Sequence, residues 1–121
     1  MTDKKTLVLG ASPNPSRYSF KAIHKLLKHG HSIIPMGIKK AEIADMQIVT
    51  NRPNFTDIHT ITMYIGIRLQ PQYYEYLISL NPKRIIFNPG TENIEFMNLC
   101  KENNIEVVEH CTLIMLNDGI F

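Results

Sequence analysis

Small residues, hydroxyls and an arginine occur together in the segment whose chemistry is clearest. Residues 10–17 read Gly-Ala-Ser-Pro-Asn-Pro-Ser-Arg, after an apolar run at 6–9 and before an amphipathic stretch at 19–29. A loop of small residues lets the backbone approach a ligand, and the helix start that follows offers free N–H groups and a positive dipole to phosphate. The expected phosphate contacts are Gly10, Ala11, Ser12, Pro13, Ser16 and Arg17. The alternative is a turn whose prolines and serines only begin a helix.

A basic segment follows the second apolar run, at residues 32–36. Met36, Gly37, Lys39 and Lys40 are its expected site residues, and no carboxylate occurs before Glu42. Domains that bind NAD usually carry an acidic residue here, which holds the ribose hydroxyls. Two lysines instead suit a ribose that carries a phosphate, as in NADP or coenzyme A. A solvated basic turn is the alternative.

Two further glycine-containing segments follow apolar runs. Ile65 and Gly66 end the β-branched run at 60–65, and Pro89 and Gly90 follow the run at 84–87. We expect these four residues to line the same site, with Gly90 leaving room for a pantetheine arm or a ring. Thr91 is the expected N-cap of a helix over 92–103.

The order of the predicted elements determines where these segments lie. Strands are expected at 6–9, 32–36, 60–65, 84–87 and 105–108, with a short extra one at 46–50; helices are expected at 19–29, 71–80 and 92–103. Alternating strands and helices predict a Rossmann-like α/β fold, a doubly wound five-stranded parallel sheet with helices on both faces. In such sheets ligands bind beyond the carboxyl ends of the strands.

Composition limits the other possibilities. The chain has 121 residues, 44% of them hydrophobic, which predicts one domain over residues 1–121. A net charge of +2 is too small for the basic face that duplex nucleic acid needs. No apolar run approaches the roughly 20 residues of a membrane span, and the polar start suggests no signal peptide. With two cysteines and no CxxC spacing, a reduced cytoplasmic protein is expected. A homodimer or an unknown protein partner stays open.

No catalytic arrangement is evident in the sequence. The five histidines have no metal-ligand spacing, and there is no GxSxG motif. Cys111 follows His110, but neighbours in sequence usually point in different directions, so Cys111 is expected to be a small packing residue. Residues 10–17 match neither GxGxxG nor GxxxxGK[ST], the usual dinucleotide and triphosphate fingerprints.

Several of these segments together resemble a known family. Residues 10–17, Ile-Ile-Pro at 33–35, Asn-Pro-Gly-Thr-Glu-Asn at 88–93 and residues 105–111 are similar to the small stand-alone CoA-binding proteins. Those proteins resemble the N-terminal CoA-binding domain of succinyl-CoA synthetase α subunits, and the likeness runs from about residue 5 to residue 116. The resemblance implies CoA phosphates on Gly10, Ala11, Ser12, Ser16 and Arg17, with Lys39 or Lys40 near the 3′-phosphate.

The sequence also departs from that family. Met36-Gly37 stands where members often have Asn-Pro, and Arg68 lies three residues beyond Ile65, where members often have an arginine directly after the strand. The phosphohistidine domain of the synthetase has no counterpart here. The sequence therefore favours a protein that binds CoA or acyl-CoA and is non-catalytic on its own. An NADP-dependent oxidoreductase-like domain and an interaction module with a vestigial nucleotide site are the alternatives.

Overall fold

A parallel five-stranded sheet forms the centre of the computed structural model, which describes residues 2–121. The strand order is β2-β1-β5-β6-β7, and every neighbouring pair is parallel. The strands are β1 (Thr6–Leu9), β2 (Ile33–Met36), β5 (Thr60–Met63), β6 (Arg84–Phe87) and β7 (Glu106–Glu109). The predicted Rossmann-like α/β fold is confirmed.

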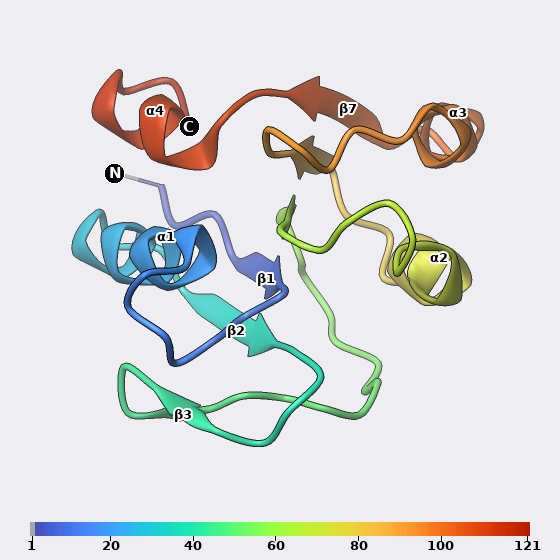
Figure 1. The fold of residues 1–121 in the computed structure, drawn as a ribbon. Coiled ribbons are helices and arrows are strands. Elements are labelled where there is room, and N and C mark those ends of the chain that lie inside the picture. Colours follow the sequence, from blue (N-terminus) through green and yellow to red (C-terminus); the bar gives the residue numbers. More distant parts are fainter. Residues whose placement is uncertain (1) are drawn as a thin grey trace.

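Helices cover both faces of this sheet. They are α1 (Tyr18–Lys28), α2 (Tyr74–Ser79) with a preceding 3-10 turn η1 (Pro71–Tyr73), α3 (Ile94–Glu102) and α4 (Thr112–Asn117). Figure 1 shows α1 and α4 on one side of the sheet and α2 and α3 on the other. Because both faces are covered, all four residues of β1, β2, β5 and β6 are buried.

Alternation along β1 shows how the sheet divides the core. Leu7 and Leu9 belong to the cluster that also holds Phe96 and Leu77 from the α2 and α3 side. Val8, between them, packs with Ile23 and Leu26 of α1. Successive strand side chains point to opposite faces, so one short strand contributes to two cores.

Some predicted elements differ from the observed ones. Thr91 is not the N-cap of α3: the Asn93 side chain accepts from the N–H of Phe96, whereas the Thr91 hydroxyl donates to the carbonyl of Asn88. The extra strand expected at 46–50 is two residues long, β4 (Met46–Gln47), and pairs antiparallel with β3 (Glu42–Ile43). Helix α4 was not predicted. No helix among residues 2–121 combines the length and apolarity that crossing a membrane requires.

Candidate functional site

A cavity of about 800 Å³ opens at the carboxyl ends of four neighbouring strands. Its walls come from the segments that follow β2, β1, β5 and β6, in the order in which those strands lie in the sheet. From β1 the chain crosses to β2 on one side and later returns to β5 on the other, so the cavity lies at the point where the winding direction changes. Its volume lies within the range of small-molecule sites, roughly 300–1,000 Å³.

The loop after β1 is held tightly against the end of β2. The backbone N–H groups of Gly10 and Ala11 both donate to the carbonyl of Met36, at 2.8 and 2.9 Å. Gly10 has φ +101°, a conformation open to glycine but strained for other residues. A Cβ on Gly37 would lie 2.7 Å from the carbonyl oxygen of Ala11. These contacts bring the loop backbone to the edge of the cavity.

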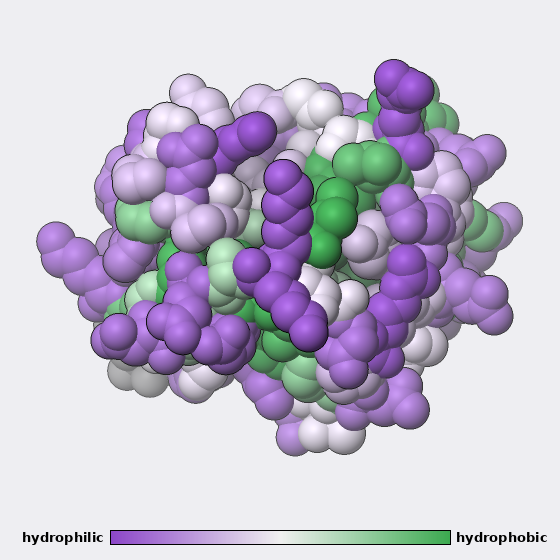
Figure 2. All heavy atoms as spheres, turned by 60° about the horizontal axis from the view of Figure 1, so that its bottom comes forward, coloured by the Kyte–Doolittle hydropathy of each residue, from purple (hydrophilic) through white to green (hydrophobic). Residues whose placement is uncertain are grey.

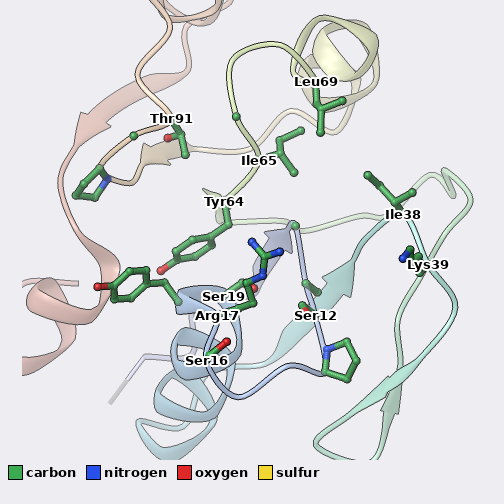
Figure 3. Close-up of a pocket in the computed structure, with 17 residues that line it drawn as sticks. Ser12, Ser16, Arg17, Ser19, Ile38, Lys39, Tyr64, Ile65, Leu69 and Thr91 are labelled. Carbon is green, nitrogen blue, oxygen red and sulfur yellow. The ribbon is translucent and has the colours of Figure 1, made fainter.

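The N-terminus of α1 is left without a side-chain cap. Arg17 occupies the N-cap position and makes no capping hydrogen bond, and the first turn holds no acidic residue. In contrast, Asn93 caps α3. The unpaired N–H groups of the first turn of α1 therefore stay available to an anion. Figure 3 shows Arg17, Ser12 and Ser16 on this side of the cavity.

Hydrogen bonds within the loop assign different roles to its two serines. The Ser12 hydroxyl oxygen accepts from the N–H of Asn14 at 3.1 Å, so its own hydrogen is free to donate to a ligand. The Ser16 hydroxyl donates to the Asn14 side-chain oxygen at 2.8 Å, which also accepts from the N–H of Ser16. Ser16 would have to exchange that partner for a phosphate oxygen.

Basic and apolar side chains lie side by side at the β2 end of the cavity. Lys39 lines it, as predicted, but Lys40 does not. Ile38, between Gly37 and Lys39, is 66% exposed and points into the same space (Figure 3). The Met36 side chain is buried in the core and its backbone holds the loop, so Met36 and Gly37 support the cavity from behind without lining it.

Apolar side chains and glycines line the opposite side. Ile65 and Leu69 point into the cavity from the segment after β5, across from Arg17 (Figure 3). A Cβ built on Gly66 or on Gly90 would meet no atom within 4 Å. The backbone is therefore bare at these two positions, where an elongated ligand could lie against it. Figure 2 shows apolar side chains exposed in a hollow among hydrophilic ones.

Eleven of the fourteen predicted site residues line the cavity, and six further lining residues were not predicted as ligand contacts. These are Tyr18, Ser19, Ile38, Tyr64, Leu69 and Thr91. Tyr64 directly follows β5, and its phenol is a group that could transfer protons. Burial raises the pKa of its hydroxyl, which has no hydrogen-bond partner among the described residues. A proton-transfer role would need the opposite shift. In the sequence, Tyr64 stands next to the predicted site residue Ile65, and Ile38 next to Lys39. This adjacency was the only signal that could have pointed to Tyr64 and Ile38.

The cysteines and histidines do not line the cavity. Residues 2–121 hold no cluster of three or more histidine, cysteine or acidic residues placed to bind a metal. The His110 ring nitrogen Nδ1 accepts from the backbone N–H of Cys111 at 2.7 Å, so that nitrogen is engaged by backbone. Cys100 is fully buried, and burial raises the pKa of its thiol to about 12.

Comparisons with known proteins show the family and the fold. A family model described as a CoA binding domain matches residues 4–117. The crystal structure of an uncharacterized protein is 47% identical, with each chain covered fully and a TM-score of 0.98. A hypothetical protein from Pyrococcus horikoshii OT3 (22% identity, TM-score 0.82, 98% of this chain and 84% of that one) shares the fold. So does cell-free ID.343 from Thermus thermophilus (20%, TM-score 0.86, 98% and 91%). No curated protein matches the chain.

Proposed function

Because the chain belongs to the CoA binding domain family, we propose that it binds coenzyme A in the cavity at the carboxyl ends of the strands. The observation that carries the proposal is the uncapped N-terminus of α1, which opens into that cavity beside Arg17. The diphosphate of CoA would accept hydrogen bonds from this first turn and from Ser12, with the Arg17 guanidinium paired to its oxygens.

The nucleotide and pantetheine parts of CoA would then face different walls of the cavity. Lys39 lies at the β2 end of the cavity, where it suits the phosphate on the ribose, and Ile38 beside it offers an apolar surface to the adenine. The pantetheine arm would run the other way, past the bare backbone at Gly66 and Gly90. An NADP ligand would share the phosphate contacts, so it is the competitor that the experiment must separate.

No catalytic step forms part of the proposal. The cavity is lined by neither a histidine nor a carboxylate, and the one tyrosine with a buried hydroxyl, Tyr64, has its pKa raised. Proton transfer at a bound thioester would need a group whose pKa is near neutral. We propose that the protein binds CoA or an acyl-CoA and is non-catalytic on its own.

Isothermal titration of the purified chain with CoA, NADP and ATP in parallel tests the proposal. We expect binding of CoA in preference to the other two. Arg17→Ala should weaken CoA binding by about 1–3 kcal/mol, the scale of a charged hydrogen bond. Arg68→Ala is the matched control, because Arg68 is an exposed arginine after β5 that does not line the cavity. Preference for NADP, or equal affinities of the two variants and wild type, would contradict the proposal.

A further inference from the structure

A fully buried glutamine connects the two segments that wall one half of the cavity. Gln70 is 0% exposed and lies just beyond Leu69, at the end of the segment that follows β5. Its amide nitrogen Nε2 donates to the carbonyl of Ile65 at 3.1 Å and to the carbonyl of Thr91 at 2.8 Å. Ile65 and Thr91 line the cavity from different strand ends, after β5 and after β6. One side chain thus joins both walls.

The remaining atom of the amide is also engaged. The Gln70 oxygen Oε1 accepts from the Asn93 side-chain nitrogen at 2.9 Å, and Asn93 in turn caps α3 through Phe96. Both hydrogens and the oxygen of the Gln70 amide are therefore used, which fixes its orientation. A buried amide satisfied in this way has one geometry, because any displacement leaves a buried polar group without a partner.

Other hydrogen bonds between the two segments lie at their starts or behind them: the Asn88 side chain donates to the carbonyl of Met63, and the Asn93 side chain to the Tyr74 hydroxyl. Neither Gly66 nor Gly90 carries a side chain, and a Cβ at either would face open space. The Thr91 N–H and hydroxyl both donate to the carbonyl of Asn88, which fixes the segment after β6 internally but not against the segment after β5. In Figure 3, Ile65 and Leu69 lie on one of these segments and Thr91 on the other.

We propose that Gln70 is a positioning residue that sets the width of the half of the cavity between the β5 and β6 segments, and so determines affinity for the pantetheine arm of CoA. The inference rests on the proposed function. Gln70 does not line the cavity, so it acts only through the backbone of Ile65 and Thr91. The nucleotide half of the cavity, built on the loop after β1 and the end of β2, makes no contact with the Gln70 amide.

Two ligands distinguish an effect on the pantetheine half of the cavity from an effect on its nucleotide half. CoA contains both arms, whereas adenosine 3′-phosphate 5′-diphosphate contains only the nucleotide part. Gln70→Met keeps the length of the side chain but removes both donors. We expect it to raise the Kd for CoA by about tenfold, because the two walls are no longer held in place before CoA binds, and to change the Kd for the nucleotide by less than about twofold.

If Gln70→Met fails to fold, a second variant tests the same hydrogen-bond network around the Gln70 amide. Asn93→Asp keeps a carboxylate oxygen to cap α3 but removes the N–H donor to the Gln70 oxygen. Like Gln70→Met, it should weaken the binding of CoA more than the binding of the nucleotide. The matched control is Leu80→Ala, a buried residue of the same core that does not line the cavity. This variant should lower the melting temperature without changing the ratio of the two affinities.

Each result decides the inference. A selective loss of CoA affinity in Gln70→Met or Asn93→Asp supports it. Equal weakening of both ligands, or no weakening of either, overturns the inference and leaves the proposed function standing. If the wild-type chain binds neither ligand, the proposed function fails and the inference fails with it.

Discussion

Individual residues distinguish this site from a generic nucleotide pocket. Lys39 lines the cavity and Lys40 does not, although the two are neighbours in sequence and both are exposed. If Lys39 pairs with the phosphate on the ribose of CoA, wild type should bind CoA more tightly than dephospho-CoA. The difference should be about two- to fivefold, the scale of an exposed ion pair. Lys39→Ala should abolish that difference when both ligands are titrated.

Lys40→Ala is the control for this prediction, since it removes the same charge from the same turn without touching the cavity wall. It should keep the preference for CoA. An unchanged preference in Lys39→Ala would mean that Lys39 does not contact the 3′-phosphate. Higher salt should reduce the preference in wild type, because the charges are exposed and screened.

At this scale the sequence pointed to some of the lining residues and not to others. Ser12, Arg17 and Lys39 were predicted because a hydroxyl or a cation after a strand has an evident use for a phosphate ligand. Ile38 and Leu69 were not predicted, because an aliphatic residue in a short segment could equally well belong to the hydrophobic core. Only the fold shows that they are 66% and 41% exposed and line the cavity.

Between elements, the contact that matters most joins the loop after β1 to the end of β2. Replacing Gly37 with alanine would place a Cβ 2.7 Å from the backbone oxygen of Ala11, which cannot rotate away. We expect Gly37→Ala to displace the loop and to destabilise the fold by about 1–3 kcal/mol, the usual cost of overpacking. Urea denaturation measures that loss, and CoA affinity should fall with it.

Gly66→Ala is the matched comparison for stability. A Cβ at Gly66 meets nothing within 4 Å, and its φ is outside the left-handed region. The variant should be as stable as wild type, or more stable by about 0.4–1 kcal/mol because alanine restricts the unfolded chain. A Gly37→Ala variant as stable as Gly66→Ala would refute the close approach of loop and strand.

Long periodic elements were predictable, whereas short ones were not. The helix at 19–29 was expected within one residue of α1, because Ile23 and Leu26 recur at helical spacing and Gly30 follows. Helix α4 has six residues, too few to show a period. Its place depends on tertiary contacts: the Thr112 hydroxyl hydrogen-bonds that of Thr62 at 2.8 Å, and its N–H donates to the Asn88 side chain. No local pattern in the sequence contains those partners.

At the scale of the whole molecule, the two ends of the central sheet differ; we call them its two poles. All five strands of the central sheet run in parallel, so the cavity lies at their carboxyl ends and a cation-rich cluster lies at their amino ends. Lys4 precedes β1, His31 precedes β2, His59 precedes β5, and Arg84 begins β6. The Arg84 guanidinium is buried, lies 4.5 Å from the Phe121 ring and donates through Nε to the Thr60 hydroxyl. This pole holds the starts of the strands together.

Two histidines make that pole sensitive to pH. Burial is the main cause that lowers the pKa of His31; Asp3 raises it, and Lys4, His29 and Arg84 lower it further. Burial also lowers the pKa of His59, together with Arg84, Lys4 and Lys83, against Glu106. The His31 nitrogen Nδ1 accepts from the backbone N–H of Lys4 at 3.0 Å, so a proton there would remove the acceptor. Both rings are therefore favoured in the neutral form.

The sign of the effect follows from linkage. Below the ordinary histidine pKa of 6.5 the unfolded chain takes up protons that the folded chain resists, so stability present above pH 6.5 is lost as pH falls toward the lowered folded values. Asp3 contributes no loss in this window, since the pKa of its carboxyl is lowered from 3.8. We expect the melting temperature to fall between pH 7 and pH 5.

A double variant, His31→Asn with His59→Asn, isolates the two rings, because asparagine offers an acceptor oxygen and does not titrate. Its melting temperature should be lower at pH 7, where packing against Phe121 is lost, yet nearly constant between pH 7 and pH 5. A decline as steep as that of wild type would place the acid sensitivity elsewhere. Because these histidines lie at the pole opposite the cavity, CoA affinity of the folded chain at pH 7 should be unchanged in the double variant.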